Sequence, residues 1–68
     1  MGDAVTIEPG QFWLTHGELW FIIAPYVEYD GTGTMWHVFR IPVLYEKEPS
    51  YQLMHDQLFF GSGARVVT

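Results

Sequence analysis

The chain has 68 residues, of which 49% are hydrophobic and 16% charged, and its formal net charge is −5 at pH 7. This length predicts a single small domain spanning 1–68, and the high apolar content excludes a disordered chain. The lack of cysteine excludes disulfides and cysteine-based metal sites. Three basic residues against eight acidic ones argue against direct binding of nucleic acid.

The apolar content is larger than one small core can enclose. A fold of this length buries about 12–15 side chains completely, roughly half of its apolar residues. The surplus has to lie on the surface or in an interface. Chains this short often need a disulfide, a metal or an oligomer for stability. We therefore expect a homo-oligomer or a permanent protein partner.

Short stretches rich in Val, Ile, Phe, Trp and Tyr alternate with turn signals along the chain. The turn signals are Pro9-Gly10, His16-Gly17, Asp30-Gly31-Thr32-Gly33, Glu48-Pro49-Ser50 and Gly61-Ser62-Gly63. The strands expected between and around them are 3–8, 11–15, 18–29, 34–45 and 64–68. This pattern predicts a mainly β fold, either a small antiparallel meander or an SH3-like barrel of about five strands.

The central hairpin is predicted to turn at Gly31-Thr32, which pairs residues whose numbers add up to 63. Arg40 then lies opposite Ile23, and Tyr26 lies opposite His37. Pro25 and Pro42 cannot donate hydrogen bonds to a neighbouring strand, so we expect bulges, bends or edge positions there.

Segment 51–60 has two interpretations. Its apolar residues follow the spacing of an amphipathic helix, with Ser50 as the N-cap and Gly61 just past the end. As a strand the segment alternates poorly. We favour a short helix at 51–60 and leave the strand open.

No residue pattern indicates catalysis, a cofactor or a metal. His16, His37 and His55 are about twenty residues apart, whereas zinc ligands usually form compact pairs. Glu28 and Asp30 lie two residues apart near the central turn, and we interpret them as solvated acids. The protein is therefore expected not to be an enzyme.

Arg40 falls on the more apolar face of the predicted hairpin, where a charged group needs a partner. Three arrangements are open. A bulge at Pro42 exposes the side chain, or the guanidinium reaches water at the rim, or it pairs with a carboxylate across an interface.

The aromatic residues carry the functional hypothesis, because exposed Trp and Tyr are enriched in protein interfaces. We expect one side of the central hairpin to be an interaction surface with Glu28 on its polar rim. The residues predicted to form this surface are Trp20, Tyr26, Met35, His37 and Phe39.

The predicted function is a non-enzymatic module that self-associates or binds a protein through this surface. Its size and acidity also permit a small accessory or inhibitor protein of a virus or mobile element. The alternative is a small-ligand or carbohydrate-binding domain that uses the same aromatics. No targeting signal or membrane-spanning run is evident, so the expected compartment is the cytoplasm.

Overall fold

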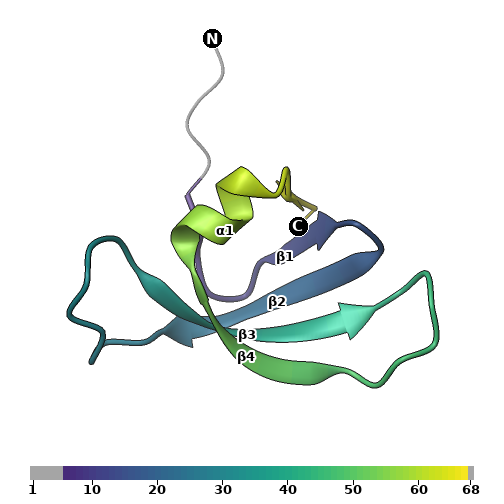
Figure 1. The fold of residues 1–68 in the computed structure, drawn as a ribbon, viewed down its shortest axis with the longest axis horizontal. Helices are drawn as coiled ribbons and strands as arrows, with labels where there is room; N and C mark the ends of the chain where they lie inside the picture. Colours follow the sequence, from purple (N-terminus) through teal and green to yellow (C-terminus); the bar gives the residue numbers. More distant parts are fainter. Residues whose placement is uncertain (1–5, 68) are drawn as a thin grey trace, which may run out of the picture.

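The computed structural model describes residues 6–67 and is mainly β (Figure 1). Five antiparallel strands form one sheet in the order β4-β3-β2-β1-β5, and one short helix, α1, stands between the last two strands of the chain. The elements are β1 (Phe12–Thr15), β2 (Glu18–Pro25), β3 (Met35–Pro42), β4 (Ser50–His55), α1 (Asp56–Gly61) and β5 (Arg65–Val66). This confirms the predicted meander.

The outer strands of the sheet do not close it. Within residues 6–67, β4 pairs only with β3 and β5 only with β1, so the SH3-like barrel stays a prediction. The expected strand at 3–8 is wrong for its described part, because residues 6–8 are not in a strand; residues 3–5 lie outside the described residues.

The hairpin of β1 and β2 has a two-residue turn. Thr15 pairs with Glu18, which leaves His16 and Gly17 as the turn residues, with φ of 44° and 85°. Two positive φ values in a two-residue turn are typical of type I′, which matches the twist of the flanking strands. This turn fixes the register of β1 against β2.

The central hairpin has a different register from the predicted one. Glu18 pairs with Pro42 and Ile22 with Val38, so the residue numbers add up to 60 and not 63. The register shifts by one residue at a bulge between Ile22 and Ala24, after which Pro25 pairs with Trp36. Over most of the hairpin the observed sum differs from the predicted one by three. An odd difference means that residues predicted to share a face of the sheet lie on opposite faces. The two prolines lie at strand ends.

Two features make up this difference. Next to the loop at 26–34 the paired numbers add up to 61, and the bulge between Ile22 and Ala24 changes the sum to 60 and so exchanges the faces of β2. The loop itself packs against the junction of β4 and α1. The Thr34 backbone N–H donates to the Asp56 carboxylate at 3.2 Å, and the Asp56 N–H donates to the Thr34 carbonyl at 2.8 Å. The His55 Nε2 lies 2.7 Å from the Thr32 carbonyl. These contacts join segments more than twenty residues apart, so the local turn signal does not set the register.

Segment 51–60 contains both of the structures that the sequence left open. Residues 51–55 belong to β4, and α1 begins at Asp56. The predicted N-cap at Ser50 is wrong. His55 is the N-cap, and its Nδ1 accepts a hydrogen bond from the Gln57 backbone N–H at 3.1 Å. The helix is therefore shorter than expected and starts five residues later.

The core lies between the sheet and α1. Figure 1 shows β4 running directly into α1, which lies near β1. The Phe59 ring makes edge contacts with Trp13 and Trp20, at centroid distances of 5.3 and 5.1 Å. The buried apolar residues on this helix-covered side are Trp13, Trp20, Ile22, Trp36, Val38, Met54 and Phe59.

This core is small for the apolar content of the chain. In the described residues seven hydrophobic side chains are buried, whereas eleven large ones are exposed. A six-residue helix covers one face of a five-stranded sheet only in part, and no other helix or strand covers the opposite face within 6–67. No helix in the described part of the chain is long and apolar enough to cross a membrane.

Candidate functional site

The face of the sheet that points away from α1, which we call the outer face, is almost entirely apolar. Side chains alternate between the two faces of a strand, so the neighbours of buried core residues point outwards. The outer face is formed by Phe12, Leu14, Leu19, Phe21, Met35, His37, Phe39, Ile41, Tyr51, Leu53 and, at its ends, His55 of β4 and Arg65 of β5. Each of them is half-buried or exposed.

An aromatic row crosses the outer face with one ring from each of four adjacent strands. Phe12 pairs with Phe21, Phe21 with Phe39, and Phe39 with Tyr51. The Phe12 and Phe21 rings have centroids 4.9 Å apart. Phe39 is 37% exposed and Tyr51 53% exposed, so the β3–β4 end of the row is open to solvent.

Aliphatic side chains extend the surface on one side of the aromatic row. Leu14 pairs with Leu19, and Leu19 with Ile41. None of the residues that β1–β4 contribute to this face carries a formal charge when His37 and His55 are neutral. Arg65 of β5, the register partner of Leu14, stands at the edge.

On the other side of the row, His37 lies between two tyrosines. Its Nδ1 forms a hydrogen bond with the hydroxyl of Tyr51, whose ring stacks on the imidazole at a centroid distance of 5.7 Å. The Tyr26 ring meets the imidazole edge-on at 5.5 Å. Within 6–67 no carboxylate lies within 4 Å of the imidazole nitrogens.

The structure brings together four of the five predicted surface residues. Met35, His37 and Phe39 alternate along β3 on the outer face, and Tyr26 contacts His37. The prediction that Trp20 lies on this surface is wrong. Trp20 is 6% exposed and belongs to the core, because the observed register turns its side chain towards α1. Glu28 is also misplaced, since β2 ends at Pro25 and Glu28 lies exposed in the following loop.

Three residues of the aromatic row were missed by the sequence analysis, namely Phe12, Phe21 and Tyr51. A signal for the first two was available. The two-residue turn at His16-Gly17 pairs Thr15 with Glu18, and the same register places Phe12 opposite Phe21. Tyr51 had no comparable signal, because its strand was predicted as a helix.

Glu18 and Arg40 form a partly buried ion pair on the helix-covered face, with 11% of the Glu18 side chain and 30% of the Arg40 side chain exposed. None of the three predicted arrangements of Arg40 describes it. Arg40 lies opposite Trp20 and donates from Nε and Nη2 to the two Glu18 oxygens, each at 2.8 Å. Trp20 Nε1 donates to Glu18 at 2.8 Å, and the Tyr45 hydroxyl donates to it as well. Arg40 Nη1 also donates to Gln52 at 2.9 Å.

The hydrogen bonds in this cluster determine the charge of Glu18. Burial alone would raise its pKa, but hydrogen bonds from Tyr45, Trp20 and Arg40, with the charge of Arg40, lower the pKa from 4.5 to about 2. The hydrogen bond to Glu18 also raises the pKa of Tyr45. A carboxylate held ionised by several donors is a poor proton acceptor, so this cluster stabilises the fold and does not suit acid–base catalysis.

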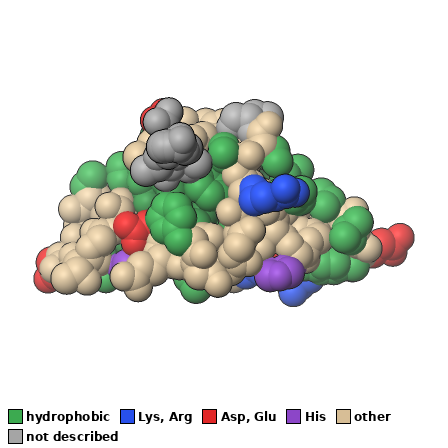
Figure 2. All heavy atoms as spheres, turned by 90° about the horizontal axis from the view of Figure 1, so that it is seen from above, with side chains coloured by type: hydrophobic (Ala, Val, Ile, Leu, Met, Phe, Trp, Pro, Cys, Tyr) green, Lys and Arg blue, Asp and Glu red, His purple; other side chains and the backbone are tan. Residues whose placement is uncertain are grey.

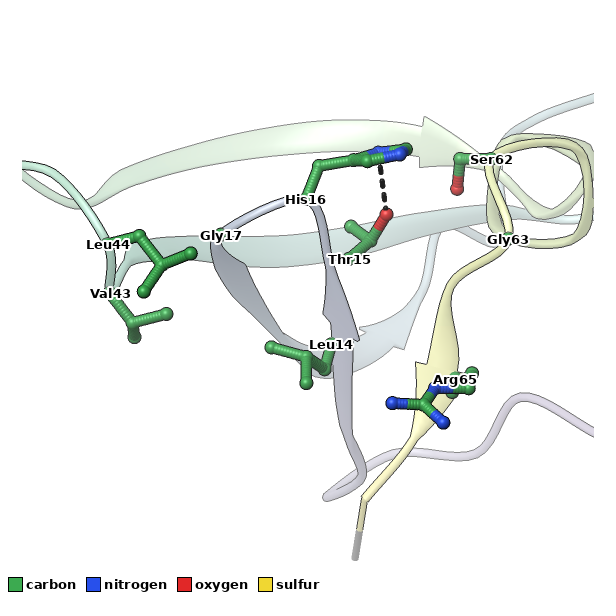
Figure 3. Close-up of a pocket in the computed structure, with 9 residues that line it drawn as sticks. All are labelled: Leu14, Thr15, His16, Gly17, Val43, Leu44, Ser62, Gly63 and Arg65. Carbon is green, nitrogen blue, oxygen red and sulfur yellow. Dashed lines mark hydrogen bonds between the residues drawn. The ribbon is translucent and has the colours of Figure 1, made fainter.

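A shallow pocket of about 370 Å³ lies beside the β1–β2 turn (Figure 3). It has polar groups on Thr15, His16, Ser62 and Arg65, with the Thr15 hydroxyl 3.1 Å from His16 Nδ1. Leu14 and Arg65 are register partners on the outer face, whereas Thr15 points to the opposite face. Because these groups belong to two faces, they do not form one convergent ligand site.

Two further observations limit the chemistry. Within residues 6–67, no three His, Asp or Glu side chains are grouped as metal ligands would be. Comparisons of the chain with protein-family models, with curated proteins and with solved structures find no match.

Proposed function

We propose that this protein is a non-enzymatic interaction domain that forms a homodimer, in which the outer faces of two copies pack against each other. The observation that carries the proposal is the aromatic row Phe12–Phe21–Phe39–Tyr51, which no described helix or strand covers. Antiparallel sheets normally have one face on the core and a polar face in water. Here the face opposite the core is apolar.

The size of the outer face supports a second copy as the occupant. The strands β1 to β4 have four, eight, eight and six residues. At about 3.3 Å per residue and about 4.8 Å between strands, they project an area of about 400 Å². Protruding side chains enlarge the accessible area towards the roughly 800 Å² that a stable interface needs from each partner. An interface of roughly 800 Å² would cover about a sixth of the 4663 Å² accessible surface of the chain.

The charge distribution also supports a second copy. Two chains of net charge −5 repel each other, but the outer face itself brings no carboxylates into contact. Figure 2 shows acidic side chains at both far ends of the molecule and another nearer its middle, with hydrophobic side chains among them. Two apolar sheets packed face to face, about 10 Å apart, keep such acids in solvent.

A pair of charge-matched variants tests the proposal. Phe39→Glu places a carboxylate in the aromatic row, whereas Val27→Glu adds the same charge to a loop residue that is 86% exposed. We expect Phe39→Glu to raise the dimer dissociation constant at least a hundredfold by sedimentation velocity, and Val27→Glu to change it less than threefold. Equal effects of both variants would contradict the proposal. A monomeric wild type that binds a glycan or metabolite would favour the ligand-binding alternative.

A further inference from the structure

The outer face carries two imidazoles, and they differ in their surroundings. His55, at the end of β4, has the Asp56 carboxylate 2.9 Å from its Nδ1. His37 lies two residues along β3 from Phe39 of the aromatic row, between Ala24 of β2 and Leu53 of β4. A second copy that covers the row therefore also covers or closely approaches this imidazole. Its protonation state then matters for assembly.

The titratable groups that face His37 are both tyrosines. Tyr51 from β4 bonds to Nδ1, and Tyr26 from the loop after β2 meets the ring edge-on. A tyrosine hydroxyl can donate to a neutral imidazole nitrogen and accept from a protonated one. The solvated monomer can therefore hold either form.

When a second copy covers the outer face, the two protonation states of His37 are no longer equally accommodated. An imidazolium taken out of water needs a nearby carboxylate, and none lies within 4 Å in the described residues. A two-fold symmetric dimer buries two copies of the group, which face the same apolar surface. The covered state therefore favours the neutral imidazole.

We propose that dimerisation is proton-linked through His37, so that protonation of this side chain releases the two outer faces from each other. The inference rests on the proposed homodimer and adds a regulation to it. An imidazole ordinarily has a pKa near 6.5. If both imidazoles must be neutral for the dimer to form, each pH unit below 6.5 increases the dissociation constant by up to a hundredfold.

General electrostatics predicts the opposite trend. Protonation of the three histidines reduces the net charge from −5 towards −2, which weakens repulsion between two copies. Weaker repulsion would tighten the dimer as the pH falls towards the pI of about 4.8. The sign of the pH dependence therefore separates the two effects.

The experiment is sedimentation equilibrium of the whole chain from pH 8 to pH 5.5 in 0.15 M salt. We expect the wild-type dissociation constant to rise about a hundredfold, and His37→Gln to reduce that rise to less than threefold. His16→Gln, in the β1–β2 turn, is the matched control and should keep the full rise. A wild-type dimer whose affinity is constant or increases at low pH would overturn the inference and leave the homodimer intact. A wild type that is monomeric at pH 8 would instead overturn the proposed function.

Discussion

At the scale of single residues, Glu18 is the clearest determinant of stability. It is 8% exposed and receives hydrogen bonds from Trp20, Arg40 and Tyr45. Removing one partner of a fully buried ion pair typically costs about 3–5 kcal/mol, because the other charge loses its compensation. The Arg40 side chain is 30% exposed, so water compensates part of its charge and the cost here lies at the lower end of that range. The side chain is therefore important for the fold although it lies outside the proposed interface.

We expect Glu18→Gln to lower the free energy of unfolding by about 3 kcal/mol at pH 7, because one amide cannot replace the carboxylate that accepts from Arg40. Urea denaturation followed by tryptophan fluorescence measures the change. Glu48→Gln, at an exposed loop position, is the control and should change stability by less than about 0.5 kcal/mol. Equal losses in both variants would contradict the assigned role of Glu18.

The pKa of Glu18 gives this difference a pH dependence. Folding lowers the pKa from 4.5 to about 2, so the carboxylate contributes stability above pH 4.5 and loses that contribution as the pH falls towards 2. The gap in unfolding free energy between wild type and Glu18→Gln should therefore shrink from pH 5 to pH 2. A gap that stays constant over this range would show that the folded carboxyl does not have the lowered pKa.

At the scale of elements, the end of α1 depends on one backbone conformation. The Ser62 N–H donates to the Leu58 carbonyl as the last i→i−4 bond of the helix, and the Ala64 N–H donates to the Phe59 carbonyl, which is the six-to-one bond of a Schellman motif. Gly63 stands between them with φ of 77°. A side chain is unfavourable in this left-handed region.

Two alanine substitutions separate this effect from helix propensity. We expect Gly63→Ala to destabilise the protein by about 1 kcal/mol, because alanine tolerates positive φ poorly. Gly61→Ala adds the same methyl group at the last residue of α1, where no atom lies within 4 Å and φ is not positive, and should be neutral or slightly stabilising. Thermal unfolding compares them, and a reversed order would contradict the assigned cap.

The elements also show how far sequence reasoning reaches. Strands joined by a short turn were predicted correctly, because the turn at His16-Gly17 specifies the β1–β2 hairpin within four residues. The central register was predicted wrongly, because its loop is held by contacts between Thr34 and Asp56, residues 22 positions apart. A bulge does lie close to Pro25, where a bulge, bend or edge position was expected, but a proline does not specify the residue at which the register shifts.

The same limit applies to the candidate surface. Alternation along β3 correctly grouped Met35, His37 and Phe39, because that inference needs only one strand. Placing Trp20 with them needed the register between two strands, and there the prediction was wrong. Sequence periodicity therefore identifies which residues share a face, whereas tertiary contacts decide which faces meet.

At the scale of the whole molecule, the two faces of the sheet differ in what covers them. The core side is covered in part by α1, which packs on three tryptophans, and the outer face presents four aromatic rings in a row. A second sheet packed on that row would supply the missing layer, as in a β-sandwich. Folding stability and assembly are then coupled, because binding to the folded state stabilises it by mass action.

The most direct test of this account is the absolute mass of the wild-type protein in solution. Light scattering on a sizing column at pH 8, over a hundredfold range of concentration, distinguishes the 7.9 kDa chain from a dimer of twice that mass. We predict the dimer mass at high concentration and a fall towards the monomer on dilution. A mass of 7.9 kDa at every concentration would contradict the account.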